Sequence, residues 1–471
     1  MRSFLRIAVF SLLLVLFSAA VAAEEPSAYI FRIDTDRAVS VQSLSGEIEP
    51  LSEEAGVYRT RDASVISDLS AAGILEDCSP DGTVYLQDFA EDTAYYGKYT
   101  SRSVPAATGC AYAAQKGITG AGVRVAVIDS GLMSGYGQYT DAVIVPGENY
   151  LVAESDPNRT DTTDTYGHGT AAVSVIADRE FGVAPKATVI PLKCFDGKTS
   201  QWSYVVAAIY AAVNDYDCDV ISMSLGATGP NSSVEDAVKY AQARGAIVVG
   251  AVGNLSSTTT GNDGLFYPAA YDGVIGVGMT NLKKEVHSLS RHTACVDVVA
   301  PGYSIPARSC STGAVIKKSG TSFSTPIVAG AVALALSADP TLTQDEIITL
   351  LHDTAEDRGD PGFDYGYGYG FLNIGLLVAA VKQDDQSMSL SCYDGKYTLS
   401  AYRAAANMDH IYCAAYGSDS TLEELTEHTV SQARWLGNNL PISADRSAVK
   451  LIITNDLFVP VLSPAEYQIA P

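Results

Sequence analysis

Three serines, Ser319, Ser322 and Ser324, lie in the segment "KKSGTSFSTPIVAGAVALAL", just before a long apolar run. A serine hydroxyl is a good nucleophile only when a base removes its proton and a third group orients that base. The alternative is that these hydroxyls merely begin a helix, because Ser and Thr are common N-cap residues. The first question is therefore whether an Asp and a His stand where they could activate one of the serines.

Asp129 and His168 are the candidates for these two partners. Asp129 ends the apolar run "VRVAVID" and is followed by Ser130-Gly131, a turn signal. His168 lies between glycines in "DTYGHGTAAV", at the start of an apolar helical pattern. Parallel α/β sheets present functional residues at the carboxyl ends of their strands. Taken singly, Asp129 fits a turn former and His168 fits a loop residue equally well.

The elements that must position these residues alternate between strand and helix from about Gly117 onward. Continuous apolar runs of this kind are typical of strands buried on both faces of a parallel sheet. They are "VRVAVID", "ATVIPLKC", "DVISMSLG", "AIVVGAVGN", "GVIGVGM" and "VDVVAPG". Helical patterns such as "WSYVVAAIYAAVNDY" and "SSVEDAVKYAQARG" separate several of them. The alternation predicts an α/β domain with a doubly wound sheet.

The segment that contains the serines predicts a central helix. Residues 322–338 are apolar on all sides, so this helix should be buried. Pro326 falls in its first turn, where a missing N–H is tolerated. The next helix should begin with a capping box formed by Thr343 and Glu346.

Together the motifs are far more specific than each is alone. "VAVIDSGL", "GHGTAAV" and "SGTSFSTP", in this order, resemble the three active-site signatures of the subtilisin-like serine proteases. The resemblance spans roughly residues 117–382 and includes "GVAP", "SLG", "YPA" and "VAPG". It implies a mainly parallel, doubly wound sheet with helices on both faces. It also implies Ser322 as nucleophile, His168 as its base and Asp129 as the group that orients His168. Ser319 and Ser324 would be structural.

The resemblance also implies an oxyanion hole and a substrate pocket. Asn254, in "GAVGNLSS", matches the asparagine whose side chain donates to the oxyanion, although a turn residue after a strand would look the same. The backbone N–H of Ser322 would be a second donor. Because the matched pocket walls carry no charge, an apolar or aromatic residue should precede the cut. These wall residues are Ser224, Leu225, Gly226, Ala251, Val252 and Gly253.

Three departures from the family pattern are visible. Ala171 stands where a second His is frequent, and "GTSFS" replaces the common "GTSMA". Only 16 residues separate His168 from Pro185, so the loop that carries a calcium site in many relatives is trimmed. We therefore expect no metal ligand there and no required cofactor. Structural calcium elsewhere cannot be assigned from the sequence.

The flanking regions predict a zymogen with an accessory domain. Residues 1–23 have the basic start, short apolar core and small residues of a signal peptide, the alternative being an uncleaved anchor. Residues 24–90 have the size and place of a propeptide and the pattern of a small α+β unit, the alternative being a retained domain. A polar, Tyr-rich stretch follows, and the cut is expected between Gln87 and Val104. Residues 91–382 would be the catalytic domain and 383–471 a small β-rich domain that stabilises or binds.

Composition limits the classes of partner. The formal net charge of −24 argues against nucleic acid, which requires clustered Lys and Arg. Export permits disulfides among the eight cysteines. Cys295 and Cys310 bracket two extended segments whose ends could meet, so we expect a disulfide between them, the alternative being two unpaired buried thiols.

The sequence thus predicts a secreted serine endopeptidase. It would act as a monomer on proteins or peptides, be blocked by its own propeptide and have no membrane anchor after signal removal. The alternatives are a catalytically silent member of the same fold that binds peptides, and a surface module.

Overall fold

The computed structural model describes residues 26–34, 48–87, 103–255 and 264–382, and the backbone of several strands between 388 and 468. The predicted signal peptide and the Tyr-rich stretch before residue 103 lie outside this part of the chain. The boundaries predicted for the domains therefore stay predictions.

A seven-stranded parallel sheet forms the centre of the molecule, in the order β14-β13-β12-β10-β6-β8-β7. The six predicted strands are all present in it, and the predicted α/β fold class is confirmed. The strands are β6 (Arg124–Asp129), β7 (Val143–Ile144), β8 (Thr188–Lys193), β10 (Val220–Met223), β12 (Ile247–Ala251), β13 (Ile275–Thr280) and β14 (Val298–Pro301).

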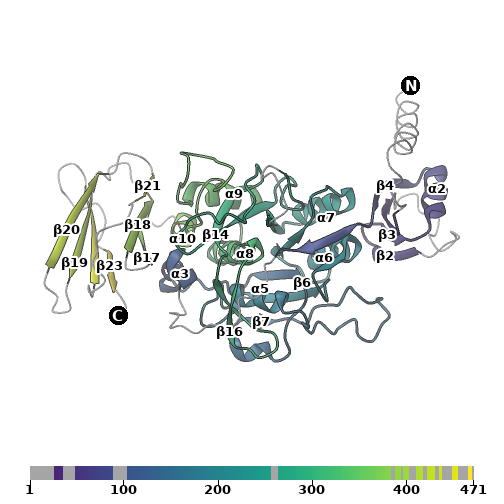
Figure 1. Ribbon diagram of the computed structural model, residues 1–471, viewed down its shortest axis with the longest axis horizontal. Helices are drawn as coiled ribbons and strands as arrows, with labels where there is room; N and C mark the ends of the chain where they lie inside the picture. The colour runs from purple at the N-terminus through teal and green to yellow at the C-terminus, as the bar shows by residue number, and fades with distance from the viewer. Residues whose placement is uncertain are drawn as a thin grey trace, which may run out of the picture.

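Helices cover both faces of this sheet (Figure 1). Along β6, Val125 and Val127 join the core under α5 (His168–Ala177) and α8 (Thr321–Ala338). Ala126 and Ile128 join the opposite core under α6 (Trp202–Asn214) and α7 (Ser232–Ala243). The alternation of side chains along a strand thus feeds two separate cores, which explains why the strands are apolar throughout.

The helix α8 is the central helix that the sequence predicts. It is 18 residues long and apolar enough to cross a membrane by length and composition, yet 89% of that window is buried inside the protein. It begins at Thr321, one residue before the predicted start. Pro326 is the sixth residue of α8, so it lies past the first turn in which the sequence placed it. The predicted capping box of Thr343 and Glu346 begins α9 (Gln344–Thr354).

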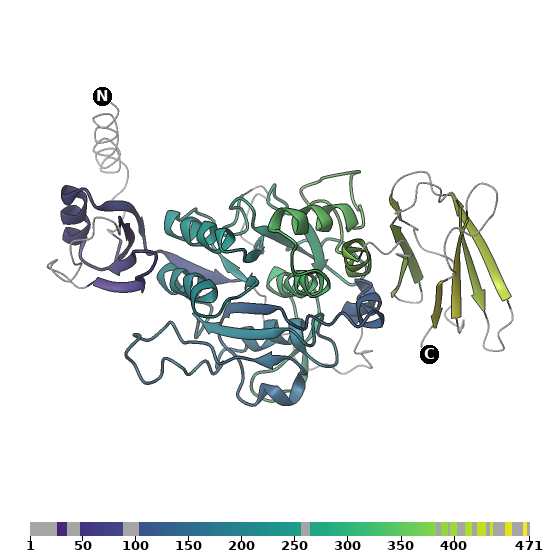
Figure 2. The same cartoon turned by 180° about the vertical axis from the view of Figure 1, so that it is seen from behind.

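The N-terminal region forms a small α+β unit, as predicted. Its four-stranded sheet has the order β2-β3-β1-β4, and α2 (Ala63–Ala72) packs on one side. Its strands are β1 (Tyr29–Ile33), β2 (Ile48–Ser52), β3 (Val57–Thr60) and β4 (Leu75–Pro80). The unit lies against α6 and α7, and the strand that follows it runs into the central domain (Figures 1 and 2). That strand is β5 (Thr83–Leu86).

Shorter elements complete the described chain. They are α3 (Ser103–Ala107), α4 (Ala111–Gln115), the 3-10 helix η4 (Tyr136–Tyr139), β9 (Thr199–Gln201), β11 (Leu225–Gly226), β15 (Ile305–Arg308), β16 (Val315–Lys318) and α10 (Ile374–Val381). Antiparallel strands follow α10, in agreement with a β-rich C-terminal region: β17 (Met388–Tyr393), β18 (Lys396–Tyr402), β19 (His410–Tyr416), β20 (Leu422–Thr429), β21 (Arg434–Leu436), β22 (Ala448–Thr454) and β23 (Ala465–Gln468).

The predicted disulfide between Cys295 and Cys310 is wrong. No disulfide joins these two residues in the structure. The prediction assumed that the chain turns back after β14, but β15 pairs with β16 and not with β14. Cys310 therefore lies in the turn of a separate hairpin.

Candidate active site

Asp129 and His168 meet where β6 ends and α5 begins. The Nδ1 atom of His168 lies 2.8 Å from both carboxylate oxygens of Asp129, and the two residues are each only 1% exposed. One of these oxygens also accepts a hydrogen bond from the backbone N–H of Ser130, at 2.7 Å. The carboxylate is thus fixed by the turn after β6 and orients the imidazole, with Nε2 on the ring's other side.

The turn after β6 and the start of α5 are tied together by polar contacts. The hydroxyl of Ser130 accepts a hydrogen bond from the backbone N–H of Gly169 (2.8 Å) and donates to Asp164 (2.9 Å). Asp164 in turn accepts from the backbone N–H of Thr170 at 2.8 Å. The backbone packing is equally close, because a Cβ atom on Gly169 would lie 2.3 Å from the carbonyl oxygen of Gly131. These contacts hold His168 in one position.

Ser322 is the second residue of α8 and is fully buried. Its hydroxyl donates to the carbonyl oxygen of Ser224 at 3.0 Å, and the hydroxyl of Ser224 donates to the carbonyl oxygen of Ser322 at 2.7 Å. The ring of the next residue, Phe323, lies 5.2 Å from the imidazole of His168, centre to centre. The N-terminus of α8 therefore lies beside the His168–Asp129 pair.

The neighbouring serines have structural contacts. The hydroxyl oxygen of Ser319 accepts a hydrogen bond from the backbone N–H of Ser304 at 2.9 Å. The hydroxyl of Ser324 donates to the carbonyl oxygen of Ala300 at 3.0 Å. Neither contact involves His168 or Asp129.

Asn254 lies at the same helix N-terminus, with its amide group oriented by Thr321. Its Oδ1 atom accepts hydrogen bonds from the backbone N–H and the hydroxyl of Thr321, at 3.0 and 3.1 Å. A backbone N–H can only donate, so the oxygen must face Thr321 and the NH₂ group must face away from it. That Nδ2 atom is buried and has no hydrogen-bond partner among the described residues.

The strand β5 of the N-terminal region lies in this site. The sequence predicts that the propeptide blocks the enzyme, but it does not indicate which residues do so. The strand β5 pairs antiparallel with β11 on one side, Leu225 opposite Leu86, and with β9 on the other. Gln87, the next residue, donates its backbone N–H to the carbonyl oxygen of Ser224 at 3.1 Å. Its own carbonyl oxygen accepts the backbone N–H of Ser322, also at 3.1 Å. The backbone N–H and carbonyl oxygen of Gln87 are thus held at the helix N-terminus that carries Ser322.

The two segments that were predicted to wall the substrate pocket, residues 224–226 and 251–253, lie beside Leu86 and Gln87, and the side chain of Phe266 lies between them. Phe266 is 4% exposed, and its ring lies against both Gly226 and Gly253. The guanidinium of Arg291 lies 5.2 Å from the centre of this ring, and burial lowers the pKa of this arginine. Neither residue belonged to the predicted site, because neither stands in one of the motifs that carried the resemblance.

Other wall residues are buried. Ser224, Leu225, Ala251 and Val252 are each at most 1% exposed. No group of three or more His, Cys, Asp or Glu residues in the part of the chain that the structure describes could hold a metal ion. The expectation that the trimmed loop after His168 binds no calcium stays a prediction.

Comparison with known proteins identifies the family. The model of the subtilase family matches residues 120–370, the segment that carries Asp129, His168, Asn254 and Ser322. The chain belongs to the subtilase family. It is 35% identical to subtilisin DY of Bacillus licheniformis over 265 residues, which are 55% of this chain and 92% of that protein.

A second relative covers more of the chain. The thermostable alkaline protease of Halalkalibacterium halodurans is 32% identical over 388 residues, 80% of this chain and 99% of that protein. Subtilisin E of Bacillus subtilis is 35% identical over 266 residues, 55% of this chain and 66% of that protein. The chain is accordingly a serine endopeptidase, a hydrolase that acts on proteins. The alternative of a silent peptide-binding member has no support in these findings.

Proposed function

We propose that this subtilase is a secreted serine endopeptidase, made as a zymogen, that cuts its own chain after Gln87. Ser322 would be the nucleophile, His168 its base and Asp129 the group that orients His168. The observation that carries the proposal is the position of Gln87. Its carbonyl oxygen accepts the Ser322 backbone N–H while β5 is paired on both edges, as an extended substrate would be.

The reaction follows the chemistry of such triads. The Ser322 hydroxyl gives up its hydrogen bond to the Ser224 carbonyl oxygen. Its Oγ atom attacks the carbonyl carbon of Gln87, and His168 Nε2 takes its proton. The bond between Gln87 and Asp88 then breaks, and the proton passes from His168 to the leaving amine. Water hydrolyses the remaining ester by the same steps.

Negative charge develops on the Gln87 carbonyl oxygen during this attack, and two donors would stabilise it. One is the backbone N–H of Ser322, which already contacts that oxygen. The other is Asn254 Nδ2, a buried donor for which the described residues offer no partner. A buried donor without a partner costs free energy in the resting enzyme, and a developing oxyanion would give it an acceptor. The start of α8 adds its partial positive charge.

The remaining parts of the proposal concern processing and location. Residues 1–23 would direct export and be removed, and residues 24–87 would be the propeptide. This places the cut at the first bond of the stretch that the sequence analysis assigned to it. The mature enzyme would be a monomer without cofactor, nucleic acid or membrane anchor, and the region after residue 382 would be an accessory domain.

Expression of Ser322→Ala beside Ser319→Ala tests the proposal. The first variant should keep the propeptide, whereas wild type and Ser319→Ala should begin at Asp88, as read by N-terminal sequencing and intact mass. A sulfonyl fluoride should label wild type on Ser322 alone, because only an activated hydroxyl reacts readily. The same N-terminus in Ser322→Ala and wild type, in a protease-deficient host, would refute self-cleavage. An adduct on Ser319 or Ser324 would refute the nucleophile.

A further inference from the structure

The pocket beside Gln87 has very little free width. A Cβ atom built on Gly226, in one wall, would lie 2.3 Å from Phe266 Cε1. A Cβ atom built on Gly253, in the other wall, would lie 2.9 Å from Phe266 Cγ. Both distances are shorter than real contacts of Cβ atoms, so the aromatic ring already touches the backbone of both walls. The space between the two walls is therefore occupied by a side chain of the enzyme itself.

Arg291 packs against the ring of Phe266. The guanidinium of Arg291 stacks over it at 5.2 Å, a distance typical of cation–π contacts. Arg291 is 6% exposed and donates to the carbonyl oxygen of Gly264 at 3.3 Å, and its backbone N–H donates to that of Gly253 at 3.2 Å. Because Arg291 is bonded to the same wall, moving the ring would disturb a buried cation.

The side chain of Gln87 does not run between the walls. Its Oε1 atom accepts a hydrogen bond from the backbone N–H of Asn254 at 3.1 Å, just beyond the wall formed by residues 251–253. Its Nε2 atom donates to the carbonyl oxygen of Tyr85, in its own strand, at 3.2 Å. The side chain thus folds back at the mouth of the pocket, where it uses both ends of its amide and is 9% exposed as a residue.

We propose that Phe266 closes the specificity pocket of this protease, so that it cuts after glutamine in preference to large apolar residues. This inference rests on the proposed cut after Gln87, which sets the register of the substrate. It departs from the apolar preference that the sequence predicts, because the charge-free walls do not reveal what fills the space between them. A large ring before the cut would meet Phe266, whereas a glutamine finds one donor and one acceptor at the mouth.

The test uses processed wild-type enzyme and peptides "VYLX" followed by a constant leaving group, where X is Gln, Glu, Leu or Phe. We expect kcat/KM for Gln to exceed that for Leu and Phe by about 10-fold or more, the scale of discrimination by pocket contacts. Gln should also exceed Glu by about 10-fold, because a carboxylate cannot donate to the Tyr85 carbonyl oxygen. Equal or faster cutting after Phe would overturn the proposal while leaving the triad intact.

The variant Phe266→Gly should raise kcat/KM for the Phe peptide relative to the Gln peptide by about 10-fold or more. If the glycine variant does not fold, Phe266→Val replaces it in the test. This variant keeps an apolar side chain and should raise the same ratio to a smaller extent. The control is Phe363→Ala, since that ring is 41% exposed and lies outside the site. An unchanged ratio in both Phe266 variants would overturn the proposal. Failure of wild type to cut any peptide, without sulfonyl labelling of Ser322, would instead refute the proposed function.

Discussion

A single methyl group on Gly169 should disable catalysis without touching a reacting atom. A Cβ atom there would lie 2.3 Å from the carbonyl oxygen of Gly131 and 2.8 Å from its nitrogen. Ordinary van der Waals contacts of a Cβ atom begin at 3.4 Å. The start of α5 and the turn after β6 must therefore separate by about 1 Å, since packed backbone does not compress.

That separation acts on the His168–Asp129 contact, because the two residues stand on the two segments that move apart. The contact is 2.8 Å long, and about 1 Å more would take it beyond hydrogen-bond range. A misplacement of about 1 Å costs about 100-fold in rate, and a triad that loses the orienting carboxylate costs about 10,000-fold. We expect Gly169→Ala to lower kcat between these limits, with a smaller effect on KM.

The assay is steady-state hydrolysis of a chromogenic peptide. A cooperative thermal unfolding transition shows independently that each variant is folded. Gly137→Ala is the matched control, because nothing lies within 4 Å of a Cβ atom at Gly137. A folded Gly169→Ala enzyme with kcat within about threefold of wild type would refute the view that close backbone packing positions His168.

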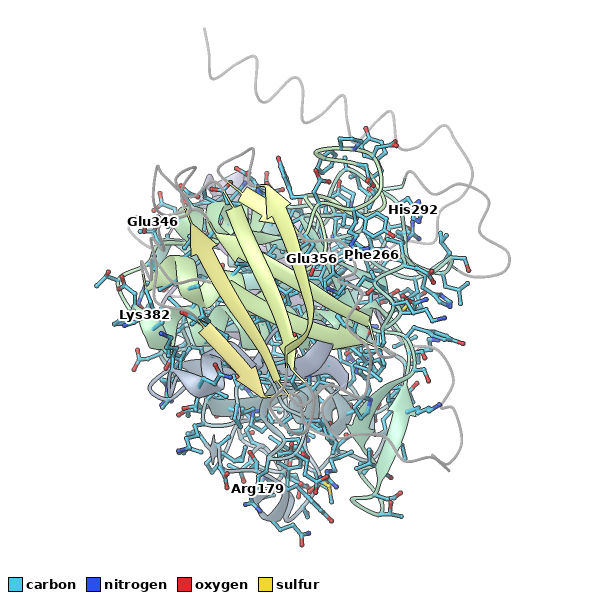
Figure 3. The ribbon with its side chains drawn as sticks, turned by 90° about the vertical axis from the view of Figure 1, so that its left-hand side faces the viewer. Arg179, Phe266, His292, Glu346, Glu356 and Lys382 are labelled. Atoms are coloured by element: carbon cyan, nitrogen blue, oxygen red, sulfur yellow. The ribbon has the colours of Figure 1, made fainter. Side chains whose placement is uncertain are left out.

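Four further predictions address the donors, the base, the buried charges and the thiols. Asn254→Ala should lower kcat about 100- to 1,000-fold with little change in KM, the loss known for the matching donor in subtilisin; an effect confined to KM would remove Asn254 from the oxyanion hole. Activity should fall as the pH drops below neutrality, because only neutral imidazole accepts a proton, and a flat profile of kcat/KM from pH 5 to 9 would exclude a histidine base. Arg308→Met should cost about 3 kcal/mol in the free energy of unfolding by denaturant, because it leaves the carboxylate of Asp178, which Arg308 Nε contacts at 2.6 Å, buried without its main partner. Arg179→Ala, which breaks an exposed pair with Asp141 at the edge of the molecule (Figure 3), should cost less than about 1 kcal/mol, and similar losses in both variants would contradict the argument. Burial raises the pKa of the Cys110 and Cys218 thiols to about 12, so they stay protonated at pH 8 and should resist iodoacetamide until unfolding; rapid labelling of either in the folded protein would be inconsistent with the packing.

Most strands of the central sheet were predictable because apolar side chains surround them on both faces. Each of the six predicted strands is buried on both faces, so it appears in the sequence as a continuous apolar run between polar turns. The short edge strand β7 has no such run, since its Val143 is 59% exposed, and it was not predicted. The central helix was predictable for the same reason, since α8 is apolar all round and buried all round. The Cys295–Cys310 pairing failed because it needed the direction of the chain after β14. That direction depends on which strand β15 pairs with, and no local pattern encodes this pairing.

The site residues that were predicted and those that were missed also differ in how much local sequence pattern surrounds them. Asp129, His168, Asn254 and Ser322 stand at the ends of strands or the starts of helices, where each is flanked by its own short motif. Phe266 directly precedes the motif "YPA", and Arg291 stands beside none of the motifs. They meet because β12, β13 and the segments after them are adjacent in the sheet, and their contact is visible only once the backbone is folded.

The register of β5 was the hardest feature to predict from the sequence, and it has the largest consequence. Leu86 and Leu225, which pair across the site, are far apart in the chain, and a shift by one residue would place a different carbonyl at Ser322. Burial selects the register: Val84 and Leu86 are at most 1% exposed, while Tyr85 between them is 44% exposed. A shift by one residue would expose both apolar side chains and bury the tyrosine. The same alternation that holds the strand in place therefore also determines which peptide bond faces Ser322.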